Sequence, residues 1–142
     1  LPVPLCIGFG EAAKVSMLSL KKEKEKTLIL RDYFYKSLKK KIKNISINGD
    51  IKKRLPSNLN ISIPGINSEV LIKNLKNTVI SSGSACTSSS IEPSYVLNAM
   101  GLSKNTIESS VRIGIGRFTT KSDINYAIKD ITQTVQKLRV NG

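Results

Sequence analysis

The sequence contains no histidine and no tryptophan, and aromatic residues make up only 5% of its 142 positions. Without histidine the chain cannot form a Ser-His-Asp triad, use an imidazole base or bind zinc through imidazole. Two cysteines, Cys6 and Cys86, are too few for a structural zinc site or a disulfide scaffold, and this usage is typical of a reducing compartment. Many common catalytic and metal-binding arrangements are therefore excluded within this chain.

Long apolar runs are also scarce. No uninterrupted run of about 18 apolar residues occurs, and the first residues lack the charged-then-apolar pattern of a signal peptide. We therefore expect no membrane partner. The chain begins Leu1-Pro2-Val3-Pro4, which resembles the interior of a longer protein more than a natural start.

Positive charge is abundant: 23 Lys and Arg residues against 10 acidic residues give a net charge of +13. Such a charge is compatible with nucleic-acid binding. However, Lys, Ile and Asn, which have A/T-rich codons, supply 47 of the 142 residues, and the basic stretches lack interleaved aromatic residues that stack on bases. We favour solvated helix faces and expect no nucleic-acid partner; a basic binding module stays open as an alternative.

Apolar periodicity predicts an α+β fold in one domain, with a long helix, a small sheet and a terminal helix. Apolar spacings of three and four predict one long helix, or two abutting ones, over residues 8–43. The apolar residues at this spacing are Ala13, Met17, Leu20, Leu30, Phe34, Leu38 and Ile42. Alternating patterns predict strands at 45–47, 59–63, 78–80 and 111–116, and further helices are expected at 68–76, after Pro93, after Ser103 and after a capping pattern at Thr120 to Asp123.

The serine-rich segment 81–90 contains Cys86. A thiol in an exposed polar loop can act as a nucleophilic thiolate, whereas a free cysteine is also often a small buried filler, and the local sequence leaves both readings open. Cys6 lies in the apolar run Leu5-Cys6-Ile7, so we expect its side chain to be buried.

The stretch Ser81-Ser82-Gly83-Ser84-Ala85-Cys86-Thr87-Ser88, followed by residues 91–97, closely resembles the active-site cysteine loop of cysteine desulfurases that serve iron–sulfur cluster assembly. Further similar pieces follow in order: residues 1–13, Asn48-Gly49-Asp50, Pro56-Ser57-Asn58 and residues 110–120. The resemblance covers nearly this whole chain but only about the last third of a family member. It implies that residues 1–142 form the C-terminal small domain of a fold-type I pyridoxal phosphate enzyme, with 1–43 a long helical connection from the missing large domain.

The resemblance also implies a reaction. In this family pyridoxal phosphate serves as the electron sink, the loop thiolate takes the sulfur of L-cysteine as a persulfide, and L-alanine leaves. By this resemblance Cys86 is the catalytic nucleophile, and the family also suggests it as a shared ligand of a transient 2Fe-2S cluster. Arg112 matches the arginine that grips the substrate carboxylate, although its local context alone favours a scaffold role. Arg117 ranks second for that contact, and Asn58 is expected to have a structural turn role.

The family's cofactor-binding residues precede this region. None of the 18 lysines matches the lysine that holds pyridoxal phosphate, so we expect no cofactor-binding residues in this chain and no activity of the chain alone. Implied partners are an iron–sulfur scaffold protein and other sulfur acceptors, with a homodimer when complete, in the bacterial cytoplasm or mitochondrial matrix. A shortened, non-catalytic sulfur acceptor or scaffold protein is the alternative.

Overall fold

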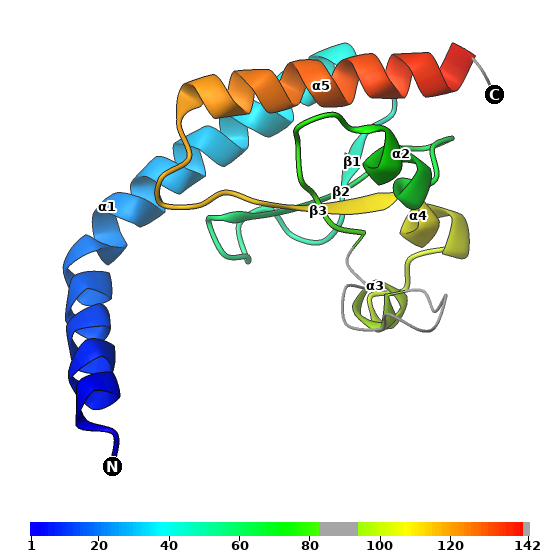
Figure 1. Cartoon of the computed structure of the whole chain (residues 1–142). Coiled ribbons are helices and arrows are strands. Elements are labelled where there is room, and N and C mark those ends of the chain that lie inside the picture. Colours follow the sequence, from blue (N-terminus) through cyan, green and yellow to red (C-terminus); the bar gives the residue numbers. More distant parts are fainter. Residues whose placement is uncertain (83–93, 141–142) are drawn as a thin grey trace.

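A three-stranded antiparallel sheet with strand order β1-β2-β3 forms the centre of the molecule (Figure 1). The computed structural model describes residues 1–82 and 94–140. The α+β class expected from the sequence is confirmed. The elements are, in order, α1 (Val3–Lys41), β1 (Ser46–Ile47), β2 (Asn58–Ser62), α2 (Ser68–Asn74), α3 (Tyr95–Ala99), α4 (Lys104–Glu108), β3 (Ser110–Gly114) and α5 (Lys121–Val140).

The two long helices, α1 and α5, pack on one face of this sheet (Figure 1). Helix α1 is one continuous helix of 39 residues, so the long helix predicted over 8–43 is confirmed and begins earlier. Its C-terminal half buries Leu30, Phe34 and Leu38, which recur every four residues and therefore share one face. Three lysines in the last turn interact favourably with the negative end of the helix dipole. Asn44 then turns the chain with a φ of 62°.

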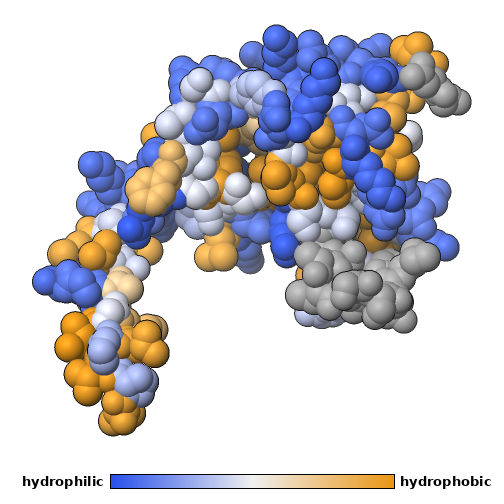
Figure 2. Space-filling view, in the orientation of Figure 1, coloured by the Kyte–Doolittle hydropathy of each residue, from blue (hydrophilic) through white to orange (hydrophobic). Residues whose placement is uncertain are grey.

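The N-terminal half of α1 extends away from the sheet, and its apolar side chains are exposed (Figures 1 and 2). Of the apolar residues at helical spacing, Met17 is 79% and Leu20 67% exposed, and Ala13 is exposed too. The expected burial of Cys6 is wrong, because its side chain is exposed. The sequence pattern was sound, but no described element lies against this part of the helix.

Helix α1 also contains an 18-residue window with a mean hydropathy of 1.3, none of it buried. By length and composition alone this one helix is able to cross a membrane. The lack of an unbroken apolar run therefore does not by itself exclude a span. Glu11 and Lys14 form an exposed ion pair of 3.5 Å within the same half of the helix.

The sheet has one apolar and one polar face. In the β2–β3 register, Leu59 lies opposite Ile113 and Ile61 opposite Val111, and these four side chains are buried towards the long helices. Helix α5 meets them with a buried stripe of Ile124, Ile128, Ile131 and Val135. The alternate residues of both strands are polar and lie on the opposite face, because side chains alternate along a strand. The apolar core and the polar side chains therefore lie on opposite faces of the same sheet.

The capping pattern predicted at the start of α5 is confirmed. The backbone N–H of Thr120 donates to Asp123 Oδ2 over 2.8 Å, and the backbone N–H of Asp123 donates back to Thr120 Oγ1 over 3.2 Å. The first of these bonds is the main reason why the pKa of Asp123 is lowered. This reciprocal pair fixes the point at which α5 begins.

The strand predicted at 78–80 is absent, and Val79 is 97% exposed. Asp130, a buried residue of α5, explains the difference. Its carboxylate accepts hydrogen bonds from three successive backbone N–H groups, those of Lys76 (3.4 Å), Asn77 (3.3 Å) and Thr78 (3.2 Å). These donors are satisfied by a side chain instead of a neighbouring strand. Burial raises the pKa of Asp130, but the hydrogen bonds outweigh it and lower the pKa overall.

Candidate functional site

The polar face of the sheet holds a pocket of 380 Å³ next to Arg112. Arg112 lies in β3, its side chain is exposed, and the β2–β3 register places Asn60 directly opposite. Three cationic side chains and a single carboxylate line this pocket, so it favours an anionic ligand. The lining residues are Asn48, Gly49, Asp50, Lys53, Arg54, Asn58, Asn60, Ser94, Val96, Leu97, Met100 and Arg112.

Cys86, the expected nucleophile, lies outside the described residues. The residues described on either side of its segment both lie near Arg112, one through backbone pairing and one in the pocket lining. On one side, the Ser81 N–H donates to the Arg112 carbonyl over 3.1 Å, and the Arg112 N–H donates to the Ser81 carbonyl over 2.6 Å. On the other side, buried Ser94 lines the pocket immediately before α3. The structure therefore brings both flanks of the cysteine segment to Arg112.

A buried polar network supports the pocket from below. Asn48 is 5% exposed, and its Nδ2 donates to Asn60 Oδ1 over 2.7 Å and to Ser110 Oγ over 2.8 Å. Its Oδ1 accepts a hydrogen bond of 2.8 Å from Ser62 Oγ. The chain of bonds ends where Ser110 Oγ donates to the Thr106 carbonyl over 2.6 Å. Buried polar groups that are all paired in this way specify one arrangement of the strands.

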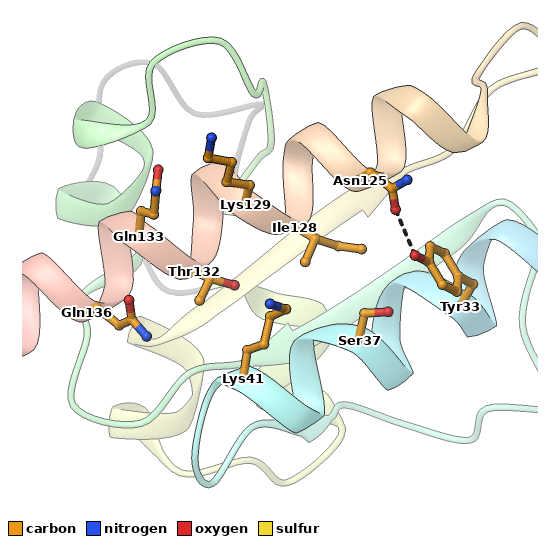
Figure 3. Close-up of a pocket in the computed structure, with 9 residues that line it drawn as sticks. All are labelled: Tyr33, Ser37, Lys41, Asn125, Ile128, Lys129, Thr132, Gln133 and Gln136. Carbon is orange, nitrogen blue, oxygen red and sulfur yellow. Dashed lines mark hydrogen bonds between the residues drawn. The ribbon is translucent and has the colours of Figure 1, made fainter.

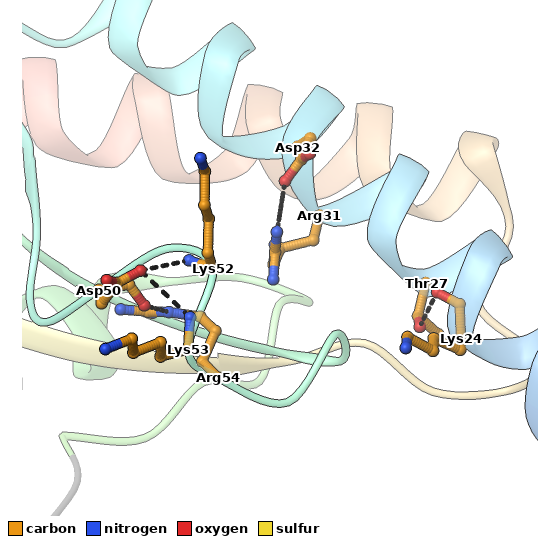
Figure 4. A network of polar contacts seen from close by, with 8 residues as sticks. All are labelled: Lys24, Thr27, Arg31, Asp32, Asp50, Lys52, Lys53 and Arg54. Carbon is orange, nitrogen blue, oxygen red and sulfur yellow. Dashed lines mark hydrogen bonds and ion pairs between the residues drawn. The ribbon is translucent and has the colours of Figure 1, made fainter.

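The loop between β1 and β2 forms one wall of the pocket and is held by its own side chains (Figure 4). Asp50 Oδ1 accepts the backbone N–H groups of Lys52 (2.6 Å) and Lys53 (3.1 Å), which lowers the pKa of Asp50. Gly49 has a φ of 78°, a conformation that favours glycine. Sequence reasoning found only a turn signal here.

Arg54 was not predicted as a site residue, and the structure gives it a structural role in this loop. Its Nε donates to the Asp50 carbonyl over 2.8 Å, and its Nη2 donates to the Asn48 carbonyl. Burial, followed by the charge of Arg31, lowers the pKa of Arg54. Arg31 is itself buried on α1 and pairs with Asp32 over 2.8 Å (Figure 4). Because these contacts occupy two of its three nitrogens, Arg54 is less available to a ligand than Arg112.

Arg117, the second candidate for the carboxylate contact, lies in a different environment. It forms an ion pair with Glu23 of α1 and donates to Ser19 Oγ over 3.2 Å. Its carbonyl accepts from Lys26 Nζ over 2.8 Å. These contacts fasten α1 to the segment after β3, and they do not bring Arg117 to the Arg112 pocket.

Asn58 begins β2, where its N–H donates to the Leu55 carbonyl over 3.0 Å. This bond closes the turn that contains Pro56, as a structural turn role requires. The Asn58 side chain in addition lines the Arg112 pocket.

A separate groove of 580 Å³ runs between α1 and α5 (Figure 3). Lys41 and Lys129 lie among its lining residues, and the Tyr33 hydroxyl donates to Asn125 Oδ1 over 2.7 Å, joining the two helices. It shares no lining residue with the Arg112 pocket. No sequence-predicted site residue lies in this groove.

The lining of the Arg112 pocket does not fit pyridoxal phosphate. The pocket offers no aromatic ring to stack on the cofactor, and Lys53, its lysine, is exposed on the β1–β2 loop. Within residues 1–82 and 94–140, no group of three or more His, Cys, Asp or Glu side chains is placed to hold a metal ion. What the pocket can do is bind an anion.

Comparison with known proteins identifies the family of the chain. Residues 1–126 match the family model for aminotransferase class-V. The chain is 44% identical over 139 residues to the cysteine desulfurase IscS of Ehrlichia chaffeensis and 45% identical over 139 residues to that of Vibrio vulnificus. Both matches cover 98% of this chain and 34% of the relative. The chain thus spans about a third of the length of these curated relatives, in their C-terminal portion.

Solved structures show the same relationship. A NifS-like protein superposes with a TM-score of 0.81 at 21% identity, over 96% of this chain and 34% of that one, which is evidence for the fold alone. A NifS-like protein from Rickettsia africae gives a TM-score of 0.78 at 27% identity, over 91% and 33% respectively. With the family model covering most of the sequence, the chain belongs to the aminotransferase class-V family.

Proposed function

We propose that this chain is the sulfur-accepting part of a cysteine desulfurase. Arg112 binds the carboxylate of L-cysteine, and Cys86 receives its sulfur as a persulfide while L-alanine leaves. The paired backbone hydrogen bonds between Ser81 and Arg112 are the observation that carries this proposal. They fasten the chain just before the cysteine segment to the residue that would hold the substrate.

The environment of Arg112 suits a carboxylate. Its guanidinium is exposed on the pocket, and within residues 1–82 and 94–140 it takes part in no ion pair or side-chain hydrogen bond. A planar guanidinium binds a carboxylate through two parallel N–H···O bonds, which a lysine cannot reproduce. Arg112 therefore supplies both charge and direction.

The proposed sulfur transfer balances without an added oxidant. The C–S bond of L-cysteine breaks and an S–S bond forms between the released sulfur and Cys86. The hydrogen of the Cys86 thiol replaces sulfur on the carbon that becomes the methyl group of L-alanine. In such reactions pyridoxal phosphate supplies the electron sink. We place that cofactor in the part of the relatives' length that this chain does not span.

The exposed apolar half of α1 supports a two-part protein. A helix that is apolar all round needs a covering surface. The family match begins at residue 1, so this segment belongs to the enzyme domain, and we propose protein and not lipid as its cover. Residues 1–43 then form the helical connection to a large domain, and residues 1–142 a C-terminal domain.

The proposed partners follow from the activity. A persulfide on Cys86 requires an acceptor, for which we propose an iron–sulfur scaffold protein and other sulfur acceptors. A homodimer, a shared 2Fe-2S ligand at Cys86, and a location in bacterial cytoplasm or mitochondrial matrix stay predictions.

The experiment compares how much sulfur is added to each of the two cysteines, Cys86 and Cys6. The chain is incubated with a small-molecule persulfide donor, and intact mass and peptide mapping locate any added sulfur atom. Cys6 is the matched control, because it is an exposed thiol far from the pocket. We expect sulfur on Cys86 in the wild type and in Cys6→Ser, and none at that site in Cys86→Ser. Equal labelling of both cysteines would show ordinary thiol reactivity and contradict the proposal.

The lining of the Arg112 pocket, which does not fit pyridoxal phosphate, favours one second candidate, a sulfur acceptor without catalysis. A second incubation of the wild-type chain distinguishes the two candidate functions. In it, L-cysteine, pyridoxal phosphate and a separately produced large domain of a relative replace the persulfide donor. Stoichiometric L-alanine with sulfur on Cys86 supports the desulfurase. Sulfur uptake from the donor without L-alanine formation supports the acceptor.

A further inference from the structure

We propose that the side-chain amide of Asn60 is a second contact for the substrate carboxylate, acting beside Arg112. This inference rests on the proposed carboxylate site and adds a residue to it. Asn60 lies in β2 and Arg112 in β3, and the antiparallel register pairs them directly. Directly opposed residues share one face of a sheet with Cβ atoms roughly 5 Å apart. Both side chains line the same 380 Å³ pocket.

The orientation of the Asn60 amide follows from the assignment of hydrogen-bond donors and acceptors in the buried network. Ser110 Oγ lies 2.6 Å from the Thr106 carbonyl, which can only accept, and 2.9 Å from its other possible acceptor, Ser62 Oγ, so the Ser110 hydroxyl proton is assigned to the shorter contact with the carbonyl. Ser110 Oγ must then act as the acceptor towards Asn48, and the atom of Asn48 that faces it must be the donor nitrogen. The Thr106 carbonyl thereby determines which terminal atom of the Asn48 side chain is the nitrogen and which is the oxygen.

The same reasoning continues to Asn60. The second N–H of Asn48 points at Asn60 over 2.7 Å, so Asn60 must present its oxygen there. A nitrogen in that place would set two donors against each other. The Asn60 amide nitrogen therefore lies on the other branch of the side chain. Among residues 1–82 and 94–140 no hydrogen-bond acceptor is paired with it.

An amide N–H beside a guanidinium suits a carboxylate, whose two oxygens offer about four acceptor positions. Arg112 attracts the anion by charge, whereas Asn60 adds a neutral donor whose direction is set by the buried network. Asn60 thus makes the pocket selective for a group that accepts from two sides. Asn48 acts through Asn60 and is a positioning residue.

The proposal is tested by nitrogen–proton NMR on the full chain, titrated with L-alanine as carboxylate probe and with L-alaninol, which lacks the carboxylate, as control. We expect the side-chain amide signals of Asn60, but not those of buried Asn48, to shift with L-alanine and to stay in place with L-alaninol. This wild-type measurement does not depend on the folding of any variant.

Substitutions then give the size of the effect. Asn60→Ala is expected to raise the dissociation constant for L-alanine about tenfold, the loss typical of a hydrogen bond to a charged group. Asn74→Ala is the control: it removes an exposed asparagine of α2 that does not line the pocket, and its dissociation constant should stay within about twofold. A thermal unfolding curve of each variant reports whether the sheet is intact.

The outcomes separate this inference from the proposed function. If L-alanine binds through Arg112 while the Asn60 signals stay still, the inference is wrong and the carboxylate site stands. Equal effects of Asn74→Ala and Asn60→Ala also overturn it. If L-alanine does not bind, or if binding is insensitive to Arg112→Lys, the proposed site itself is wrong.

Discussion

Ser81 and Arg112 are joined by two backbone hydrogen bonds, although they lie on opposite sides of the cysteine segment in the sequence. Both bonds use main-chain atoms, so the Arg112 side chain remains available to the pocket. Holding the segment and binding a ligand are therefore separate tasks of one residue, and side-chain substitutions affect only the second.

Arg112→Lys should weaken binding of a carboxylate ligand about tenfold with little change in stability, because a point charge replaces a two-pronged contact. The titration with L-alanine measures it. Arg117→Lys is the control, since that side chain contacts Glu23 and Ser19 and not the pocket. It should leave binding unchanged and lower the unfolding midpoint. The reverse pattern would assign the ligand contact to Arg117.

Asp130→Asn should lower the free energy of unfolding by about 1–3 kcal/mol, because hydrogen bonds to a buried charge are replaced by weaker neutral ones. Urea unfolding measures the loss. Asp123→Asn, which alters an exposed cap, should cost about 1 kcal/mol or less and is the comparison. A smaller effect at Asp130 than at Asp123 would refute the proposed tether of residues 76–78.

The Asp130 effect should also depend on pH. Its pKa is lower in the folded than in the unfolded chain, so the unfolded state binds the proton first as pH falls. The contribution is complete above the unfolded pKa of about 3.9 and disappears as pH drops through the depressed folded pKa. The stability difference between wild type and Asp130→Asn should therefore shrink only in acid. A difference that stays constant across this range would show that the charge is not involved.

Replacing exposed apolar residues of α1 should change association but not folding. The triple variant Leu5→Gln, Phe9→Gln and Leu18→Gln alters side chains that cover nothing in the described structure. We expect an unchanged unfolding midpoint, together with at least tenfold weaker binding to a separately produced large domain. Sedimentation velocity of the mixture measures binding. Unchanged assembly, or loss of binding to lipid vesicles instead, would reject a protein cover.

Asn48→Ala should destabilise the fold by about 1–3 kcal/mol, since it leaves buried partners in Asn60, Ser62 and Ser110 without their bonds. Chemical unfolding measures this loss. Asn74→Ala is the control, because that amide makes one exposed bond to its own helix. Similar losses in the two variants would show that the network under the pocket contributes little.

Features set by neighbouring residues were predictable, and those set by distant contacts were not. The buried stripe of α1 at Leu30, Phe34 and Leu38 follows from helical spacing. Residues 78–80 have the composition of a strand, but Asp130 of α5 takes up the backbone donors before them. Cys6 has apolar neighbours, yet the surface that would cover it is not among the described elements.

The candidate site shows the same division. The resemblance singled out Arg112 and Cys86 because local motifs carry them. Arg112 pairs across the sheet with Asn60, and this pairing depends on the register of two strands about fifty residues apart in the sequence. No local motif predicts it. Arg54 is an exception to this division, since its contacts reach back only four and six residues into its own loop, yet no motif in the sequence marks it.

The two faces of the sheet have a consequence for how this protein tolerates change. One set of strand residues packs against the helices: Leu59, Ile61, Val111 and Ile113. Asn60 and Arg112 alternate with them and line the proposed ligand pocket. Leaving aside Ser62 and Ser110, which are buried in the polar network, random substitutions at strand positions 58–61 and 111–114 should fall into two classes in alternating order, one detected by solubility and one by ligand preference. A library restricted to the odd or even positions would thus vary one property while sparing the other.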